Sequence, residues 1–132
     1  MFRLWKVLAV VAASFIVVAC SAGNTPEATA KAFIEKSYAG DAEAVLALMH
    51  LPADAKPGES ELIQGKIKAT VAEQKAEAQE KGGLKAVTVQ SSEIDKNDPN
   101  HARVAVHIQF ANGSDTETVR LIKIDGKWKV RV

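Results

Sequence analysis

The chain has 132 residues, of which 47% are hydrophobic and 25% charged, and its formal net charge is +1. This length and composition are those of one ordinary globular domain. The nearly balanced charge argues against a nucleic-acid partner, because such proteins normally carry a strongly basic surface. We therefore expect a single domain that does not bind nucleic acid.

Residues 1–19 have the composition of a signal peptide. Arg3 and Lys6 are basic, and residues 8–19 are apolar except for Ser14. A basic head and an apolar stretch too short for a comfortable membrane span are typical of secretion signals. The alternative is an uncleaved N-terminal anchor, which the short apolar stretch disfavours. Removal of residues 1–19 takes away two basic residues and changes the net charge from +1 to −1.

The only cysteine of the chain, Cys20, directly follows the apolar stretch. Exported proteins use cysteines in pairs, so a single one implies an intermolecular disulfide, a reactive site or another modification. The segment Val17-Val18-Ala19-Cys20 resembles the lipobox of bacterial lipoproteins. In that family the signal is cut before the cysteine, diacylglycerol is attached to the sulfur, and the new amine is usually acylated.

The lipobox resemblance implies that residues 20–24 are a lipidated cysteine and a short tether. Two or three acyl chains hold a protein stably on a membrane, whereas one holds it only marginally. In lipoproteins of enteric-type bacteria, an aspartate after the cysteine favours the inner membrane, and Ser21 stands there instead. We therefore expect a bacterial envelope protein, anchored at the periplasmic face of an outer membrane where the source has one.

Helix signals dominate the first half of the remaining chain, residues 25–132. Thr25 and Asp41 are suited to cap helix starts, and Gly40 is suited to end the first helix. The predicted helices cover residues 26–39, 42–49 and 59–81.

Strand signals dominate the second half. Asn112-Gly113 and Asp125-Gly126 are hairpin turns between segments of alternating apolar residues. The apolar residues change face within the third strand, which predicts either a β-bulge or a strong twist near Leu121. The predicted strands cover residues 84–93, 102–110, 116–124 and 128–132. Helices followed by antiparallel strands indicate an α+β fold, with the helices on one face of a curved four-stranded sheet.

The order of these elements, the opening Thr25–Ala28, the turn Tyr38–Asp41 and the ending Arg120–Val130 resemble a known family. These are small bacterial lipoproteins of uncharacterised function with a cystatin-like, or nuclear-transport-factor-2-like, cone fold. In that family the sheet curls around helices and leaves a conical pocket. The pocket is catalytic in some relatives, binds ligands in others, and is filled in many.

The resemblance places a candidate ligand pocket at Tyr38, Phe110 and Trp128. Tyr38 is the one helical residue that can bring a hydroxyl into the cone, although a lone tyrosine among aliphatic residues is more often part of the core. Enzymatic relatives carry an acid or base in the cone, whereas the strand positions predicted to face inward are all apolar. These positions are Val87, Val89, Val104, Val106, Ile108, Phe110, Trp128 and Val130. We therefore expect no catalytic residue and no cofactor.

The histidines do not form a metal site. His101 and His107 share the outward face of one strand but lie about 20 Å apart at ~3.3 Å per residue. His50 follows the second predicted helix, where a cation complements the helix dipole. We expect no metal ion.

A cluster of basic residues near the C-terminus has two interpretations. It consists of Arg120, Lys127, Lys129 and Arg131. The charges either protect an edge strand against pairing with other sheets or form a docking surface for an anionic partner, such as lipid head groups or an envelope protein.

Together these patterns predict a membrane-anchored, non-catalytic lipoprotein that binds a protein partner or a small apolar ligand. The alternative is an isomerase or hydrolase of the cone-fold type, with its pocket near Tyr38.

Overall fold

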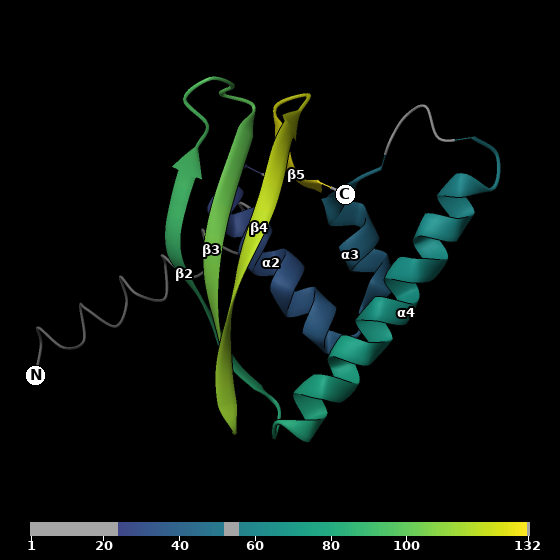
Figure 1. Cartoon of the computed structure of the whole chain (residues 1–132), viewed down its shortest axis with the longest axis vertical. Coiled ribbons are helices and arrows are strands. Elements are labelled where there is room, and N and C mark those ends of the chain that lie inside the picture. Colours follow the sequence, from purple (N-terminus) through teal and green to yellow (C-terminus); the bar gives the residue numbers. More distant parts are fainter. Residues whose placement is uncertain (1–23, 52–55, 132) are drawn as a thin grey trace, which may run out of the picture.

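The computed structural model describes residues 24–51 and 56–131. The predicted signal peptide and Cys20 lie outside the described residues, so both stay predictions. The elements follow in the order α2 (Pro26–Ala39), α3 (Ala42–Leu48), β1 (Met49–His50), α4 (Glu59–Glu80), β2 (Leu84–Ile94), β3 (His101–Phe110), β4 (Gly113–Ile124) and β5 (Lys127–Arg131) (Figure 1).

The helix ends confirm the predicted caps. The Thr25 side chain accepts a hydrogen bond from the backbone N–H of Ala28 at 3.2 Å, and the Asp41 side chain accepts one from Ala44 at 3.1 Å. Gly40 ends α2 in the left-handed region, with φ of 82°. These interactions satisfy backbone groups that the helix leaves unpaired at its ends.

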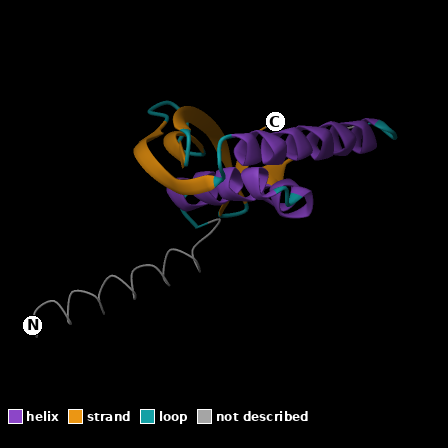
Figure 2. Ribbon diagram, turned by 90° about the horizontal axis from the view of Figure 1, so that it is seen from below, coloured by secondary structure: helices purple, strands orange, loops and turns teal. Residues whose placement is uncertain are grey.

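The strands form one five-stranded sheet in the order β1-β5-β4-β3-β2. All neighbours are antiparallel except β1, which pairs with β5 in parallel. The expectation of four strands is therefore wrong by one. Strand β1 has only two residues, which is too short to show an alternating pattern, and only the fold brings it beside β5. Figure 2 shows the sheet curling around one side of the helices.

Of the two predictions for the region of Leu121, the bulge is wrong, and the strong twist stays a prediction. The pairing of β3 with β4 runs without a break from His101 opposite Ile122 to Phe110 opposite Gly113. The apolar residues change face because β4 carries them on both faces, with Leu121 buried on the inner face and Ile122 half-buried on the outer face. The register shifts occur in β2 instead, between Leu84 and Ala86 and between Val89 and Ser91.

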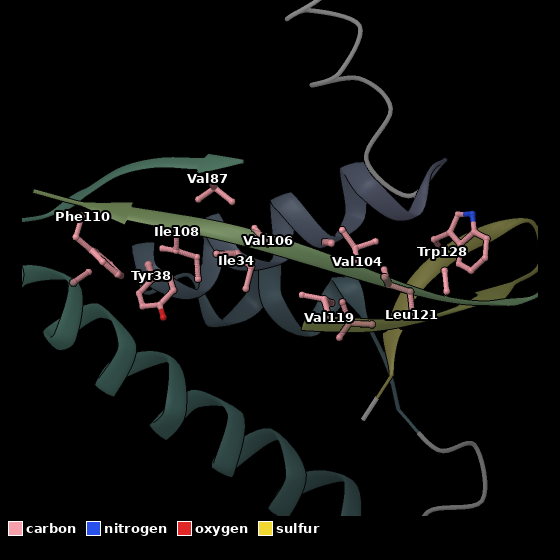
Figure 3. Close-up of a cluster of buried hydrophobic side chains, with 14 residues drawn as sticks. Ile34, Tyr38, Val87, Val104, Val106, Ile108, Phe110, Val119, Leu121 and Trp128 are labelled. Atoms are coloured by element: carbon pink, nitrogen blue, oxygen red, sulfur yellow. The ribbon is translucent and has the colours of Figure 1, made fainter. Parts of the chain in front are cut away.

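The core lies between α2 and the inner face of the sheet (Figure 3). Its buried side chains are Ala30, Ile34, Tyr38, Ala78, Val87, Ala102, Val104, Val106, Ile108, Phe110, Val119, Leu121, Trp128 and Val130. Of the strand positions predicted to face inward, all are buried here except Val89, which is partly buried against this core. The predicted inner face is confirmed for β3, where every second residue from Ala102 to Phe110 is buried.

Helix α4 packs against α2 and α3 (Figure 1). Val71 and Ala78 are its buried residues, as expected for a helix with only a thin apolar stripe. Within the described part of the chain, no helix is long and apolar enough to cross a membrane.

Candidate functional site

Two of the three predicted pocket residues meet at one end of the core. The rings of Tyr38 and Phe110 pack edge to face, with centroids 5.2 Å apart and an angle of 78° between the ring planes. Trp128 lies at the other end of the core, beside Leu121 (Figure 3). The exposed fractions of Tyr38, Phe110 and Trp128 are 6%, 1% and 4%, so all three rings fill the core. The structure therefore does not bring them together around one pocket.

Two carboxylates project from the inner face of the sheet, beside Tyr38. Glu117 lies directly opposite Val106, and Asp115 lies directly opposite Ile108. Directly opposite residues of antiparallel strands lie on the same face, so both acids lie on the face that carries the core. The expectation of a wholly apolar inner face is therefore wrong. The sequence did contain a signal for these acids. Val119 and Leu121 are inward residues two positions apart, and the same spacing toward the start of β4 leads to Glu117 and Asp115.

Burial and the negative charges of these carboxylates raise the pKa values of Tyr38 and Glu117. The pKa of Tyr38 is raised to about 12, first by burial and then by the negative charges of Glu117, Glu77 and Asp115. The pKa of Glu117 is itself raised, mainly by burial and further by Asp115 and Glu77. We call Glu77, Asp115 and Glu117 the acidic end of the core.

One cation compensates part of this charge. Lys81 pairs with Glu77 at 3.0 Å and lies 4.9 Å from the centroid of the Phe110 ring. No hydrogen bond joins the Tyr38 hydroxyl to another described residue, and no buried polar side-chain atom in these ranges is left without a partner. The hydroxyl is therefore open to water. At neutral pH it is a protonated hydrogen-bond donor, because its pKa lies far above that pH.

A cavity opens elsewhere, at the start of β3 and on the outer face of the sheet. Its volume is about 470 Å³. Its charged lining residues are Glu93, Asp95, Lys96, Arg103, Arg120 and Arg131. Four of the six are cations, so the outer cavity is basic whereas the acidic end of the core is negative.

The family model for a domain of unknown function, DUF4878, matches residues 18–131. The chain belongs to the DUF4878 family. It is also similar to the solved structure of a Campylobacter jejuni protein named "Putative NTF2-like transpeptidase", with 30% identity and a TM-score of 0.75. The match covers 82% of this chain and 98% of that one. Among curated proteins, none matches the chain. The predicted α+β fold of the nuclear-transport-factor-2-like type is thus confirmed, with five strands in place of four.

The four basic residues of the predicted docking surface do not all lie at one site in the DUF4878 domain. Arg120 and Arg131 line the outer cavity. The Lys129 ammonium donates a hydrogen bond to the carbonyl of Ala47 at 2.7 Å, and Lys127 is exposed at the start of β5. Protection of an edge strand explains this cluster only in part: β1 pairs with Val130 and Arg131 alone, so it leaves Lys127 and Lys129 uncovered, whereas Arg120 belongs to β4, which lies between β5 and β3.

The histidines of the DUF4878 domain lie apart from the core. His101 Nδ1 is 3.1 Å from a carboxylate oxygen of Asp98, and His107 Nε2 is 3.4 Å from the side-chain oxygen of Gln109. His50 lies in β1, opposite Arg131. In residues 24–51 and 56–131, no three histidine, cysteine or acidic side chains are arranged to hold a metal ion.

Proposed function

We propose that this protein is an envelope lipoprotein, anchored through Cys20, whose DUF4878 domain binds a partner and catalyses no reaction. The anchor rests on the lipobox resemblance of residues 17–20 and on the lack of a second cysteine for a disulfide. The outer membrane is the favoured location, because Ser21 rather than aspartate follows the cysteine.

One observation carries the binding part of this proposal: the side chains of the core occupy the interior of the cone. Ile34, Ile108 and Phe110 are each at most 1% exposed, and the 470 Å³ cavity described above lies on the outer face. Ligand sites are concave and usually largely formed in advance. This arrangement favours a partner that meets the outer face over a small apolar ligand inside the cone.

The runner-up is an enzyme with its site at Tyr38, and the name of the similar Campylobacter jejuni protein suggests a transpeptidase. The inward carboxylate of Glu117 favours this candidate, because a carboxyl group with a raised pKa suits proton transfer. The phenol weighs against it as a nucleophile, because a pKa of about 12 leaves Tyr38 protonated at neutral pH. No hydrogen bond within the described residues links Tyr38 to a base. We therefore prefer the non-catalytic proposal.

Mass spectrometry of the protein purified from its native envelope tests the anchor. We expect a mature chain that begins at Cys20 and carries the mass of two or three acyl chains, and we expect Cys20→Ser to accumulate as unprocessed precursor in the membrane. Ser21→Ala is the matched control, because it leaves the lipobox cysteine in place. A mature wild-type chain with a free thiol at Cys20 would contradict the proposed anchor.

A further inference from the structure

Three arginines from three neighbouring strands line the outer cavity. Arg103 on β3 lies directly opposite Arg120 on β4. Arg131 follows Val130, the β5 residue opposite Leu121 of β4, so the register brings Arg131 beside Arg120. Val130 and Leu121 are buried on the inner face, and alternation therefore places Arg120 and Arg131 on the outer face. We call Arg103, Arg120 and Arg131 the arginine row.

The arginine row has few internal partners. Arg103 lies 3.5 Å from a Glu93 carboxylate oxygen, but both side chains are more than 60% exposed, so the pair contributes little. Within the described ranges, Arg120 and Arg131 have neither an ion pair nor a side-chain hydrogen bond. Like charges directly opposite each other destabilise a sheet. Repulsion among these arginines therefore destabilises the free protein locally, and a bound anion would reduce that repulsion.

The acidic residues near the arginine row make part of their hydrogen bonds within the loop between β2 and β3. An Asp95 carboxylate oxygen accepts the backbone N–H of Asn97 at 2.8 Å. Asp98 accepts the backbone N–H of Asn100 at 3.0 Å and also pairs with His101. These interactions stabilise the loop between β2 and β3, whereas the arginine row and Lys96 leave an excess of positive charge in the cavity.

We propose that the outer cavity binds a phosphate group, held by the arginine row. The planar guanidinium presents paired N–H donors that match two oxygens of a phosphate, which makes arginine the preferred residue for this recognition. A volume of about 470 Å³ exceeds what a bare phosphate needs, so the cavity has room for a polar group attached to it. Glu93 and Asp95 in the lining can accept hydrogen bonds from hydroxyl or ammonium groups of such a ligand.

The direction of α2 indicates where this phosphate comes from. Tyr38, near the end of α2, contacts Phe110 at the end of β3, and the start of α2 lies at the Val104 and Trp128 end of the core (Figures 1 and 3). The outer cavity lies at this same end. An anchor at Cys20, four residues before Asn24, would hold this end close to the membrane. A lipid headgroup is therefore the favoured source, and this choice of source, unlike the site itself, rests on the proposed anchor.

Calorimetric titration of the full chain in phosphate-free dodecyl maltoside micelles tests the site. One arm adds inorganic phosphate at constant ionic strength, and the other adds phosphatidylglycerol to the micelles. We expect Arg120→Gln to weaken binding about tenfold or more, the loss typical of a charge-assisted pair of hydrogen bonds. Lys127→Gln is the matched control, because it removes the same charge from an exposed position outside the cavity, and we expect less than about a twofold change.

The outcomes show whether the outer cavity binds phosphate at all and whether that phosphate belongs to a lipid headgroup or to a soluble ligand. A headgroup site predicts binding of phosphatidylglycerol that Arg120→Gln weakens, whereas binding of inorganic phosphate alone supports a soluble ligand in the same cavity. No binding in either arm, or equal weakening by Arg120→Gln and Lys127→Gln, overturns the site. Arg103→Gln, on another strand, provides a second variant should Arg120→Gln fail to fold. These results do not depend on acylation of Cys20, so the mass spectrum can contradict the anchor while the site stands.

Discussion

At the scale of the residue, the proton affinity of Tyr38 depends on its burial and on the nearby Glu117 of β4. The chain has a single tyrosine, and its ring packs against Phe110 while Glu117 lies on the same inner face. Burial disfavours the phenolate, and the nearby carboxylates disfavour it further by like-charge repulsion. Both effects act in the same direction, so the pKa rises to about 12.

We expect Glu117→Gln to lower the pKa of Tyr38 below about 12, because Glu117 makes the largest electrostatic contribution of the three carboxylates, while the burial of Tyr38 is unchanged. The ultraviolet absorbance of the phenolate reports the titration without interference from another tyrosine. Circular dichroism recorded in parallel shows whether the chain stays folded at high pH. Glu80→Gln, which removes an exposed carboxylate of α4, is the control. An identical titration in the wild type and Glu117→Gln would mean that burial alone raises the pKa.

At the scale of the element, the turn between α2 and α3 depends on a glycine. Gly40 has φ of 82°, a conformation that costs residues with a side chain about 1–2 kcal/mol. A Cβ atom at this position would also lie 2.5 Å from the Cδ of Lys75 on α4. The turn therefore combines a backbone requirement with a close approach of the third helix.

We expect Gly40→Ala to lower the free energy of unfolding by about 1–2 kcal/mol, mainly through the backbone, because the flexible Lys75 side chain can move aside. Urea unfolding followed by circular dichroism measures the change. Gly65→Ala is the matched control: Gly65 lies inside α4 with open space around its Cβ position. There the same substitution should raise the free energy of unfolding by up to about 1 kcal/mol. Equal effects at both positions would contradict the argument.

At the scale of the whole molecule, the last strand closes the sheet over the core. Trp128 is 4% exposed and Val130 is 5% exposed, and both belong to β5. Strand β5 pairs with β4 on one side and with β1 on the other. The Lys123 ammonium lies 5.9 Å from the centroid of the Trp128 ring, which covers that end of the core. The C-terminal strand is thus integral to the fold.

We expect Trp128→Ala to lower the free energy of unfolding by about 3–5 kcal/mol, the usual loss for a large aromatic residue removed from a core. This is a large share of the roughly 5–15 kcal/mol that stabilises a typical domain. Denaturant unfolding followed by circular dichroism measures the loss. Lys127→Ala, its exposed neighbour, should change the value by less than about 0.5 kcal/mol. An unfolding midpoint unchanged in Trp128→Ala would mean that β5 is peripheral to the core.

Local patterns determined the helices, most of the strands and the main face of the core. The caps at Thr25 and Asp41, the stop at Gly40 and the alternation of β3 are all confirmed. Each depends on residues a few positions apart along the chain, and the period of side chains in a helix or strand encodes it directly. Hence the α+β class could be predicted from sequence. The lipobox at Cys20 also comes from the sequence and stays a prediction.

Tertiary structure decided the features that depend on pairing between distant segments. Strand β1 exists because the fold brings Met49 and His50 beside β5. Glu117 reaches the side of Tyr38 through the register of β4 on β3. The arginine row draws its three members from three strands, and in the sequence only two of them belong to one basic cluster. Such neighbours have no common local period, because hydrogen bonding between strands, and not spacing along the chain, determines which side chains meet.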